Sequence, residues 1–237
     1  MAEGLIERRI HNFKKTNFGN LSPNQIRMET LWDSTSVSFN GSGGNALYIL
    51  VGGKDPGDGD DYGYITNVTT GGSTRVLYSS KGDKTIDVRG GCVVVGMKSS
   101  SDTCTVSFRD TAMTIIIARV DVPNGKIDVV GKQSKTWWEA GTHGISITKT
   151  NEPVGNLFIG VASMGSHDGD RNASCSRSNC NGSQLVTGTS LGWNRQLIAT
   201  FIPSAATNSF SVSTSNGGND GYLEVHSCWM FKVYSNY

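Results

Sequence analysis

A dense group of carboxylates lies between residues 55 and 61. This segment reads DPGDGDD and contains Asp55, Asp58, Asp60 and Asp61. Carboxylate oxygens are the ligands that Ca²⁺ prefers, but the EF-hand pattern fails, because the twelfth position counted from Asp55 is Thr66 and not a bidentate glutamate. We expect a solvated acidic turn and no bound cofactor. The four carboxylates remain weak candidates for a Ca²⁺ site of another geometry.

A second polar stretch gathers groups that can bind metals or oxidise. It contains His167, Asp168, Asp170, Cys175 and Cys180. One histidine followed by two cysteines at a spacing of five matches none of the paired short intervals that tetrahedral zinc sites use. A disulfide between the two cysteines is the alternative in oxidising surroundings. Reduced thiols in an exposed loop are the interpretation that we prefer.

The sequence contains a match to a nucleophile motif, but the residues around it do not predict the secondary structure that the motif requires. Residues 188–192 read GTSLG, which satisfies the G-x-S-x-G pattern with Ser190 as nucleophile. That pattern requires a strand, a sharp turn and a helix, whereas the residues after it predict a turn and a strand. Only Asp220 or Glu224 and His226 follow as partners for a triad. We therefore predict that the protein is not an enzyme.

Two adjacent tryptophans form the best candidate for a binding feature. Trp137 and Trp138 precede Glu139, in a stretch that we interpret as a loop over residues 131–142. Exposed indoles stack on sugar rings, and they also anchor protein interfaces. Core packing, a subunit interface and ligand stacking all stay open for this pair.

The first 33 residues differ from the rest and predict an amphipathic arm. Apolar residues at helical spacing indicate a short helix up to about Lys15, and basic residues add local positive charge. The apolar positions are Leu5, Ile6, Ile10 and Phe13, and the basic positions are Arg8, Arg9, Lys14 and Lys15. The helix could pack on its own domain or attach to a neighbouring subunit. A nucleic-acid contact is the least favoured use, because no second basic cluster accompanies it.

Composition excludes several classes of protein. The chain has 237 residues, of which 30 are glycine, with 36% hydrophobic and 17% charged residues. These proportions exclude a coiled coil and a helical bundle. The formal net charge of +1 provides no field to attract a polyanion, so nucleic acid is not an expected partner. No apolar run approaches membrane-span length and the first residues lack a secretory signal, so we expect no membrane partner and synthesis in a cytoplasm.

From about residue 34 onward the sequence predicts an all-β domain. Short β-favouring runs alternate with Gly, Asn, Asp and Ser clusters, and several runs alternate apolar and polar residues, as in 105–108 and 144–147. Pro123-Asn124-Gly125 predicts a hairpin between 113–122 and 126–130. Long loops are predicted at 52–62, 131–142 and 165–188. The expected fold is an antiparallel, jelly-roll-like β-sandwich over 34–237, with the short helical arm over 1–33.

The arm, the cysteine-poor sandwich rich in Gly, Ser, Thr and Asn, and the aromatic last strand (CWMFKV, 228–233) together resemble viral structural proteins. Bacteriophage tail, fibre and head-decoration proteins are the most similar in style. The resemblance implies a virion component that self-assembles, often as a trimer, with other virion proteins and a host-surface glycan as further partners. It would reach the virion after synthesis in the host cytoplasm. The alternatives are a carbohydrate-binding module or lectin and, third, an occlusion-body matrix protein of insect viruses.

Overall fold

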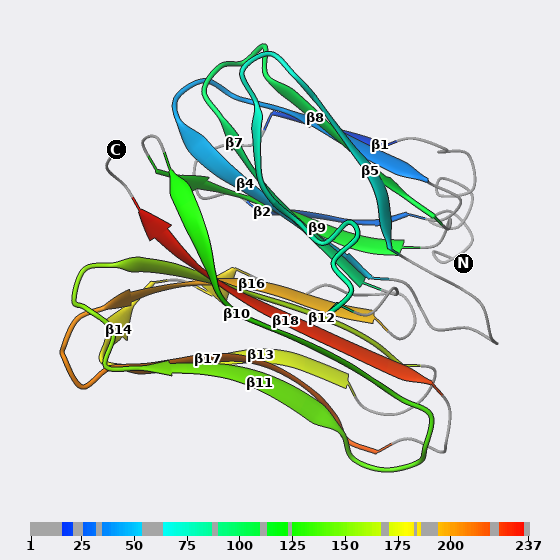
Figure 1. Cartoon of the computed structure of the whole chain (residues 1–237), viewed down its shortest axis with the longest axis vertical. Coiled ribbons are helices and arrows are strands. Elements are labelled where there is room, and N and C mark those ends of the chain that lie inside the picture. Colours follow the sequence, from blue (N-terminus) through cyan, green and yellow to red (C-terminus); the bar gives the residue numbers. More distant parts are fainter. Residues whose placement is uncertain are drawn as a thin grey trace, which may run out of the picture.

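The chain forms an all-β structure of sheets stacked in four layers (Figure 1). The computed structural model describes residues 16–20, 26–31, 35–53, 64–86, 90–109, 113–122, 125–166, 171–182, 184–185, 194–218 and 223–234. Within these ranges the regular elements are strands, and none of them is a helix. The predicted fold class is confirmed at this level: antiparallel sheets pack together as β-sandwiches.

The first two layers come from the first half of the chain and are called the first sandwich. Its outer sheet has the order β1-β3-β8-β5, and its inner sheet has the order β2-β9-β4-β7-β6. All pairings are antiparallel except that of β1 with β3. The strands are β1 (Thr16–Asn20), β2 (Ile26–Leu31), β3 (Ser36–Asn40), β4 (Ala46–Gly53), β5 (Ile65–Gly71), β6 (Arg75–Ser79), β7 (Gly90–Met97), β8 (Thr103–Phe108) and β9 (Met113–Asp121).

The other two layers form the second sandwich. Its inner sheet has the order β10-β18-β12-β16-β14, with β15 also paired to β16, and its outer sheet has the order β11-β17-β13. The strands are β10 (Lys126–Trp137), β11 (Gly144–Thr150), β12 (Leu157–Ser166), β13 (Arg171–Ser178), β14 (Cys180–Asn181), β15 (Gln184–Leu185), β16 (Asn194–Pro203), β17 (Ser209–Asn216) and β18 (Glu224–Tyr234). The region 34–237 therefore spans most of two sandwiches.

The two sandwiches share one strand order. The inner sheets run β2-β9-β4-β7 and β10-β18-β12-β16, and the outer sheets run β3-β8-β5 and β11-β17-β13. In the first half, β6 lies between β5 and β7 in the chain and joins the inner sheet. In the second half, β14 and β15 lie between β13 and β16 and also join the inner sheet. The same architecture has thus been built twice along the chain, although the sequence shows no repeat at a fixed period.

Backbone hydrogen bonds between the loops repeat as well. In each half, the last residue of the central outer strand (β8 or β17) donates its N–H to the residue just before the neighbouring strand (β3 or β11). The residue just after that neighbouring strand donates its N–H to the residue just before the central strand begins. With the N–H donor first, the matched pairs are Phe108 with Thr35 (2.8 Å) and Asn216 with His143 (3.0 Å), then Gly41 with Asp102 (2.8 Å) and Asn151 with Asn208 (3.1 Å). By this match, Thr35 of the first sandwich is equivalent to His143 of the second, and Phe108 is equivalent to Asn216.

Three apolar cores hold the four layers together. In β4, Tyr48 and Leu50 pack toward the outer sheet, while Leu47, Ile49 and Val51 pack toward the second sandwich. Because the inner sheets are buried on both faces, β4 reads as a continuous apolar run instead of an alternating one. A third core lies between β18, β12 and β16 on one side and β11 and β17 on the other.

The predicted hairpin at residues 123–125 is wrong. β9 pairs with β2 and β4 in one inner sheet, while β10 pairs with β18 in the other. A Pro-Asn-Gly signal predicts a turn, but turn chemistry does not decide which sheet receives the next strand. The chain uses this link to pass from the first sandwich to the second.

Two of the predicted long loops contain strands. Residues 131–137 continue β10 and pair with 224–230 of β18 after a bulge, and 171–178 form β13. The polar residues of β10 fit because β10 is an edge strand of its sheet. In β13, only Ala173 and Cys175 pack against the core, so its apolar signal is too weak to be recognised.

The predicted N-terminal arm lies partly within the described residues. The helix expected up to Lys15 falls outside them, as do the apolar and basic residues named for it. Residues 16–20 and 26–31 are strands β1 and β2, and they pair into the outer and inner sheets of the first sandwich.

Candidate functional site

The equivalent ends of the two sandwiches lie side by side, and we call this region the loop end. Gly53 closes β4 and Gly90 opens β7, and both backbones lie against Ser163 of β12, with Ser227 of β18 near Gly90. The segments 54–63, 167–170, 186–193 and 219–222 connect strands at this end. Loops on a rigid scaffold are where recognition usually resides, which makes the loop end the first place to examine.

Between the two inner sheets, the apolar core gives way at the loop end to a group of buried polar side chains, the interlayer polar patch. Its buried members are Ser163, Asn194, Gln196 and Ser227, and the half-buried Ser134 of β10 joins them. The hydroxyls of Ser134 and Ser227 lie 2.9 Å apart and hydrogen-bond to each other. Gln196 is fully buried, and neither its Nε2 nor its Oε1 has a hydrogen-bond partner.

Glycine is required opposite this patch. A Cβ at Gly53 would lie 2.7 Å from the Ser163 Oγ and 2.9 Å from the Gln196 Nε2. The β4 backbone can therefore approach the polar side chains this closely only without a side chain of its own.

On the other face of the same inner sheet lies a second polar group, the histidine cluster, made of Trp137, His143, Thr214, Glu224 and His226. The Glu224 Oε2 accepts a hydrogen bond from His143 Nδ1 at 3.0 Å and lies 3.5 Å from His226 Nε2. His226 Nδ1 pairs with the Thr214 hydroxyl at 2.9 Å. The side chains of Glu224 and His226 have no exposed surface, so the cluster is a closed polar unit.

Strand register brings these residues together. Trp137, the last residue of β10, is paired with Glu224, the first residue of β18, so both side chains lie on the same face of the sheet. Residues 138–143 then carry the chain across to β11, which places the His143 ring on the Trp137 indole at a centroid distance of 4.7 Å. The His226 ring also contacts the Trp137 indole, edge-on, at a centroid distance of 4.9 Å.

Burial controls the charge of His226. Loss of water around the imidazole, with the neighbouring His143, lowers the pKa of His226 to about 4, and the hydrogen bond to Thr214 offsets this only in part. The imidazole is therefore neutral at pH 7, and its Nε2 has no hydrogen-bond partner. Holding a neutral imidazole without a partner for one of its nitrogens destabilises the folded chain.

The cluster resembles a catalytic triad in its order of atoms but not in its surroundings. A hydroxyl, an imidazole and a carboxylate follow one another through Thr214, His226 and Glu224. All three residues are buried, so a substrate cannot reach the hydroxyl while the sandwich is closed. Within the described ranges, no group of three or more His, Cys, Asp or Glu residues is arranged to hold a metal ion.

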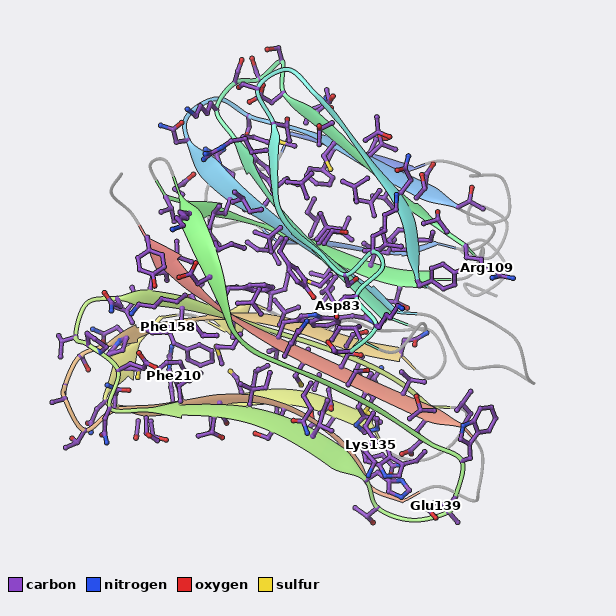
Figure 2. All side chains as sticks on the ribbon, viewed as in Figure 1. Asp83, Arg109, Lys135, Glu139, Phe158 and Phe210 are labelled. Carbon is purple, nitrogen blue, oxygen red and sulfur yellow. The ribbon has the colours of Figure 1, made fainter. Side chains whose placement is uncertain are left out.

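The two adjacent tryptophans have different environments. Trp137 is buried in the core of the second sandwich with 8% of its surface exposed, while Trp138 is 63% exposed. Lys135 lies with its Nζ 4.8 Å from the Trp137 ring, and Figure 2 shows Lys135 and Glu139 on the same edge of the second sandwich. Of the pair, Trp138 alone presents a large aromatic surface to solvent.

A cavity of about 290 Å³ lies at the loop end of the first sandwich. Its walls include Tyr64, Ile65, Asp83 and Ile86. Hydrogen bonds from Lys132 and Thr85 overcome the effect of burial and lower the pKa of Asp83 to about 2. The carboxylate is thus ionised, but its oxygens are already used in bonding within the protein, including the 2.6 Å ion pair that links it to Lys132 of the second sandwich.

Most of the other residues singled out from the sequence cannot be placed at the site. Asp55, Asp58, Asp60 and Asp61, together with His167, Asp168, Asp170 and Ser190, lie outside the described residues. Cys175 and Cys180 are partly buried free thiols. Cys92, Cys104 and Cys228 are free and buried.

Sequence reasoning missed the histidine cluster. His143 and Glu224 are 81 positions apart, and only the pairing of β10 with β18 and the 138–143 segment bring them together. A local signal does exist, because Glu224 and His226 occupy alternate positions in a strand that is otherwise almost entirely apolar. Titratable residues at alternate positions of a buried strand indicate a buried polar pair.

No protein-family model matches this chain, and no curated protein matches it. No helix in the described part of the chain has the length and apolar character needed to cross a membrane.

Proposed function

We propose that the protein is a non-enzymatic structural component of a virion that assembles with copies of itself. The observation that carries this proposal is the repetition of one strand order in two sandwiches packed through their inner sheets. The inner-sheet orders β2-β9-β4-β7 and β10-β18-β12-β16 support a jelly roll, an architecture shared by viral capsid proteins and lectins. The departure from that pattern is the transfer of β6, and of β14 with β15, to the inner sheets.

The outer faces of the molecule favour contacts between copies. Outward side chains on β3 and β8 of the first outer sheet and on β11, β17 and β13 of the second are small and uncharged. Several hydroxyls bond across strands, as Ser38 does with Thr105 (2.8 Å) and Ser176 with Ser211 (2.8 Å). Charged residues are depleted at the centres of protein interfaces, because burying a charge requires its desolvation. Two copies could approach through these faces without burying charge.

Light scattering after size-exclusion chromatography tests self-assembly of the full chain. We expect a mass close to three times that of the 25.3 kDa chain, since a trimer is the favoured assembly. A single-chain mass at every concentration would contradict the proposal.

Charge insertion tests which surface is used. Ser211→Lys places an ammonium in the middle of an outer face, and we expect it to shift the assembly toward single chains. Ser100→Lys adds the same charge to an exposed turn away from that face and serves as the control. Equal masses for the two variants would move the contact elsewhere, with the N-terminal arm as the next surface to test.

Glycan binding is a second candidate function, favoured by the exposure of Trp138. An indole that is 63% exposed beside the carboxylate of Glu139 offers a stacking face and a hydrogen-bond acceptor for a sugar ring. On a glycan array, Trp138→Ala should abolish binding, while Val154→Ala, which removes another exposed apolar side chain, should leave it unchanged. A chelator tests in the same assay whether calcium at Asp58 and Asp60 takes part.

A further inference from the structure

The repeated architecture provides an internal comparison for the histidine cluster. Val106 lies two residues before Phe108 in β8, and Thr214 lies two residues before the equivalent Asn216 in β17. Near the start of β9, the equivalent of β18, the buried side chains facing the outer sheet are Ile115 and Ile117. The first sandwich thus fills with apolar residues the region where the second places an imidazole, a carboxylate, a hydroxyl and an amide.

The fold therefore does not require the polar cluster. Burying a carboxylate and an imidazole destabilises a protein compared with well-packed apolar residues of similar size. The cluster also leaves His226 Nε2 without a hydrogen-bond partner, and Asn216 Nδ2, two positions after Thr214 on β17, lacks one as well. Apolar residues do the same structural task in the first sandwich, so the cluster is best explained by something other than stability.

The cluster fastens one particular segment. Trp137 precedes residues 138–143 and His143 is the last of them, and the stacked rings of these two residues bring the two ends of the segment together. The hydrogen bond from His143 to Glu224 ties the end of this segment to the first residue of β18. Trp138 and Glu139 lie at the exposed part of this segment.

We propose that the histidine cluster is an acid-sensitive latch, which holds the 138–143 segment against the second sandwich at neutral pH and releases it in acid. In the closed form, the neutral His226 lies against the Glu224 carboxylate, and both side chains are fully buried. Protons from solvent enter when the segment opens, and they protonate an imidazole that is then hydrated. Acid thus favours the open form, which binds the proton more strongly.

The other charged and titratable groups around the cluster do not account for the proton uptake assigned to His226. Lys135 lies over the outer face of Trp137 and is exposed. On the core-facing side of the inner sheet, Arg195 is paired with Met164 of β12, which is itself paired with His226. Burial raises the pKa of the Cys228 thiol to about 12, so it stays protonated throughout the relevant range.

Hydrogen exchange on the full chain tests the latch. The amide of Asn216 reports on the 138–143 segment, because its N–H donates to the His143 carbonyl. Its protection factor, corrected for intrinsic exchange, should fall roughly 70-fold between pH 7.5 and pH 4.5, which is the ratio of proton uptake by an imidazole of ordinary pKa to proton uptake by one with a pKa near 4. Residues 151–156, at the opposite end of the same sandwich, serve as the internal control and should change little. Unchanged protection of the Asn216 amide in acid would overturn the proposal.

A variant separates the latch from general acid damage. His226→Phe keeps an aromatic ring beside Trp137 but removes the titrating group, so the pH dependence of the Asn216 protection should shrink to a few-fold. The same large loss of protection in this variant would also overturn the proposal. If the variant does not fold, a histidine NMR titration of the unaltered chain decides, since the latch requires His226 to titrate below pH 5 and an ordinary value near 6.5 would exclude it.

Discussion

The His226 side chain is fully buried, and its Nε2 faces the Glu224 carboxylate at 3.5 Å. Because the pKa of the imidazole falls to about 4 in the folded chain, the unfolded chain binds a proton between about pH 6.5 and pH 4 that the folded chain does not. The folded chain is therefore unaffected by this titration above pH 6.5 and loses stability as the pH falls toward 4. Urea unfolding should show a decrease of about 3 kcal/mol between pH 7 and pH 4.

The matching control is His226→Phe. Its unfolding free energy should vary less with pH than that of the unaltered chain, by about the same 3 kcal/mol. Parallel pH profiles for the two proteins would show that His226 does not titrate as its burial requires.

Gln196 gives a second test at the scale of one residue. Both of its amide atoms are buried without partners, which costs about 1–3 kcal/mol. Gln196→Leu keeps most of the volume and removes the polar atoms, so denaturant unfolding should show unchanged or higher stability. Gln196→Ala, which leaves a cavity, should lose about 2 kcal/mol. A clear loss in the leucine variant would mean that the amide has a partner.

Among the elements, edge strands and buried strands differ in how well their sequences reveal them. β4 and β9 are long apolar runs, and β11 and β17 alternate regularly, so all four were recognisable. β10 beyond its bulge is rich in Lys, Gln and Ser, and β13 is built of Ser, Asn and Arg, so both read as loops. Sheet partners stabilise these strands, and a local pattern does not contain that information.

The close approach of β4 to the second sandwich can be tested by adding one methyl group. Gly53→Ala would place its Cβ within 3 Å of the Ser163 Oγ and the Gln196 Nε2, so thermal unfolding should reveal a loss of about 1–3 kcal/mol. The control is Gly96→Ala on β7, where the nearest atom would be 3.6 Å away and the effect should be small. Ser163→Ala in the Gly53→Ala background should restore part of the loss, and its failure to do so would argue against this contact.

At the scale of the whole molecule, the sequence predicts an all-β, antiparallel sandwich but not its duplication. Turn signals and alternation act over a few residues, whereas the match between halves resides in strand order and in loop contacts such as Asn151 with Asn208. The histidine cluster was hidden for the same reason, since its members join across the second sandwich. The two adjacent tryptophans were noticeable in the sequence, but the sequence left open which of them is buried and which is exposed.

The central proposal is that two equivalent sandwiches, fused through their inner sheets, form a unit that assembles with copies of itself. Electron cryo-microscopy of the purified full-length chain tests this most directly. The account predicts closed symmetric particles of several copies, with threefold symmetry favoured. Fields that contain only separate single chains, at concentrations well above those used for chromatography, would contradict it.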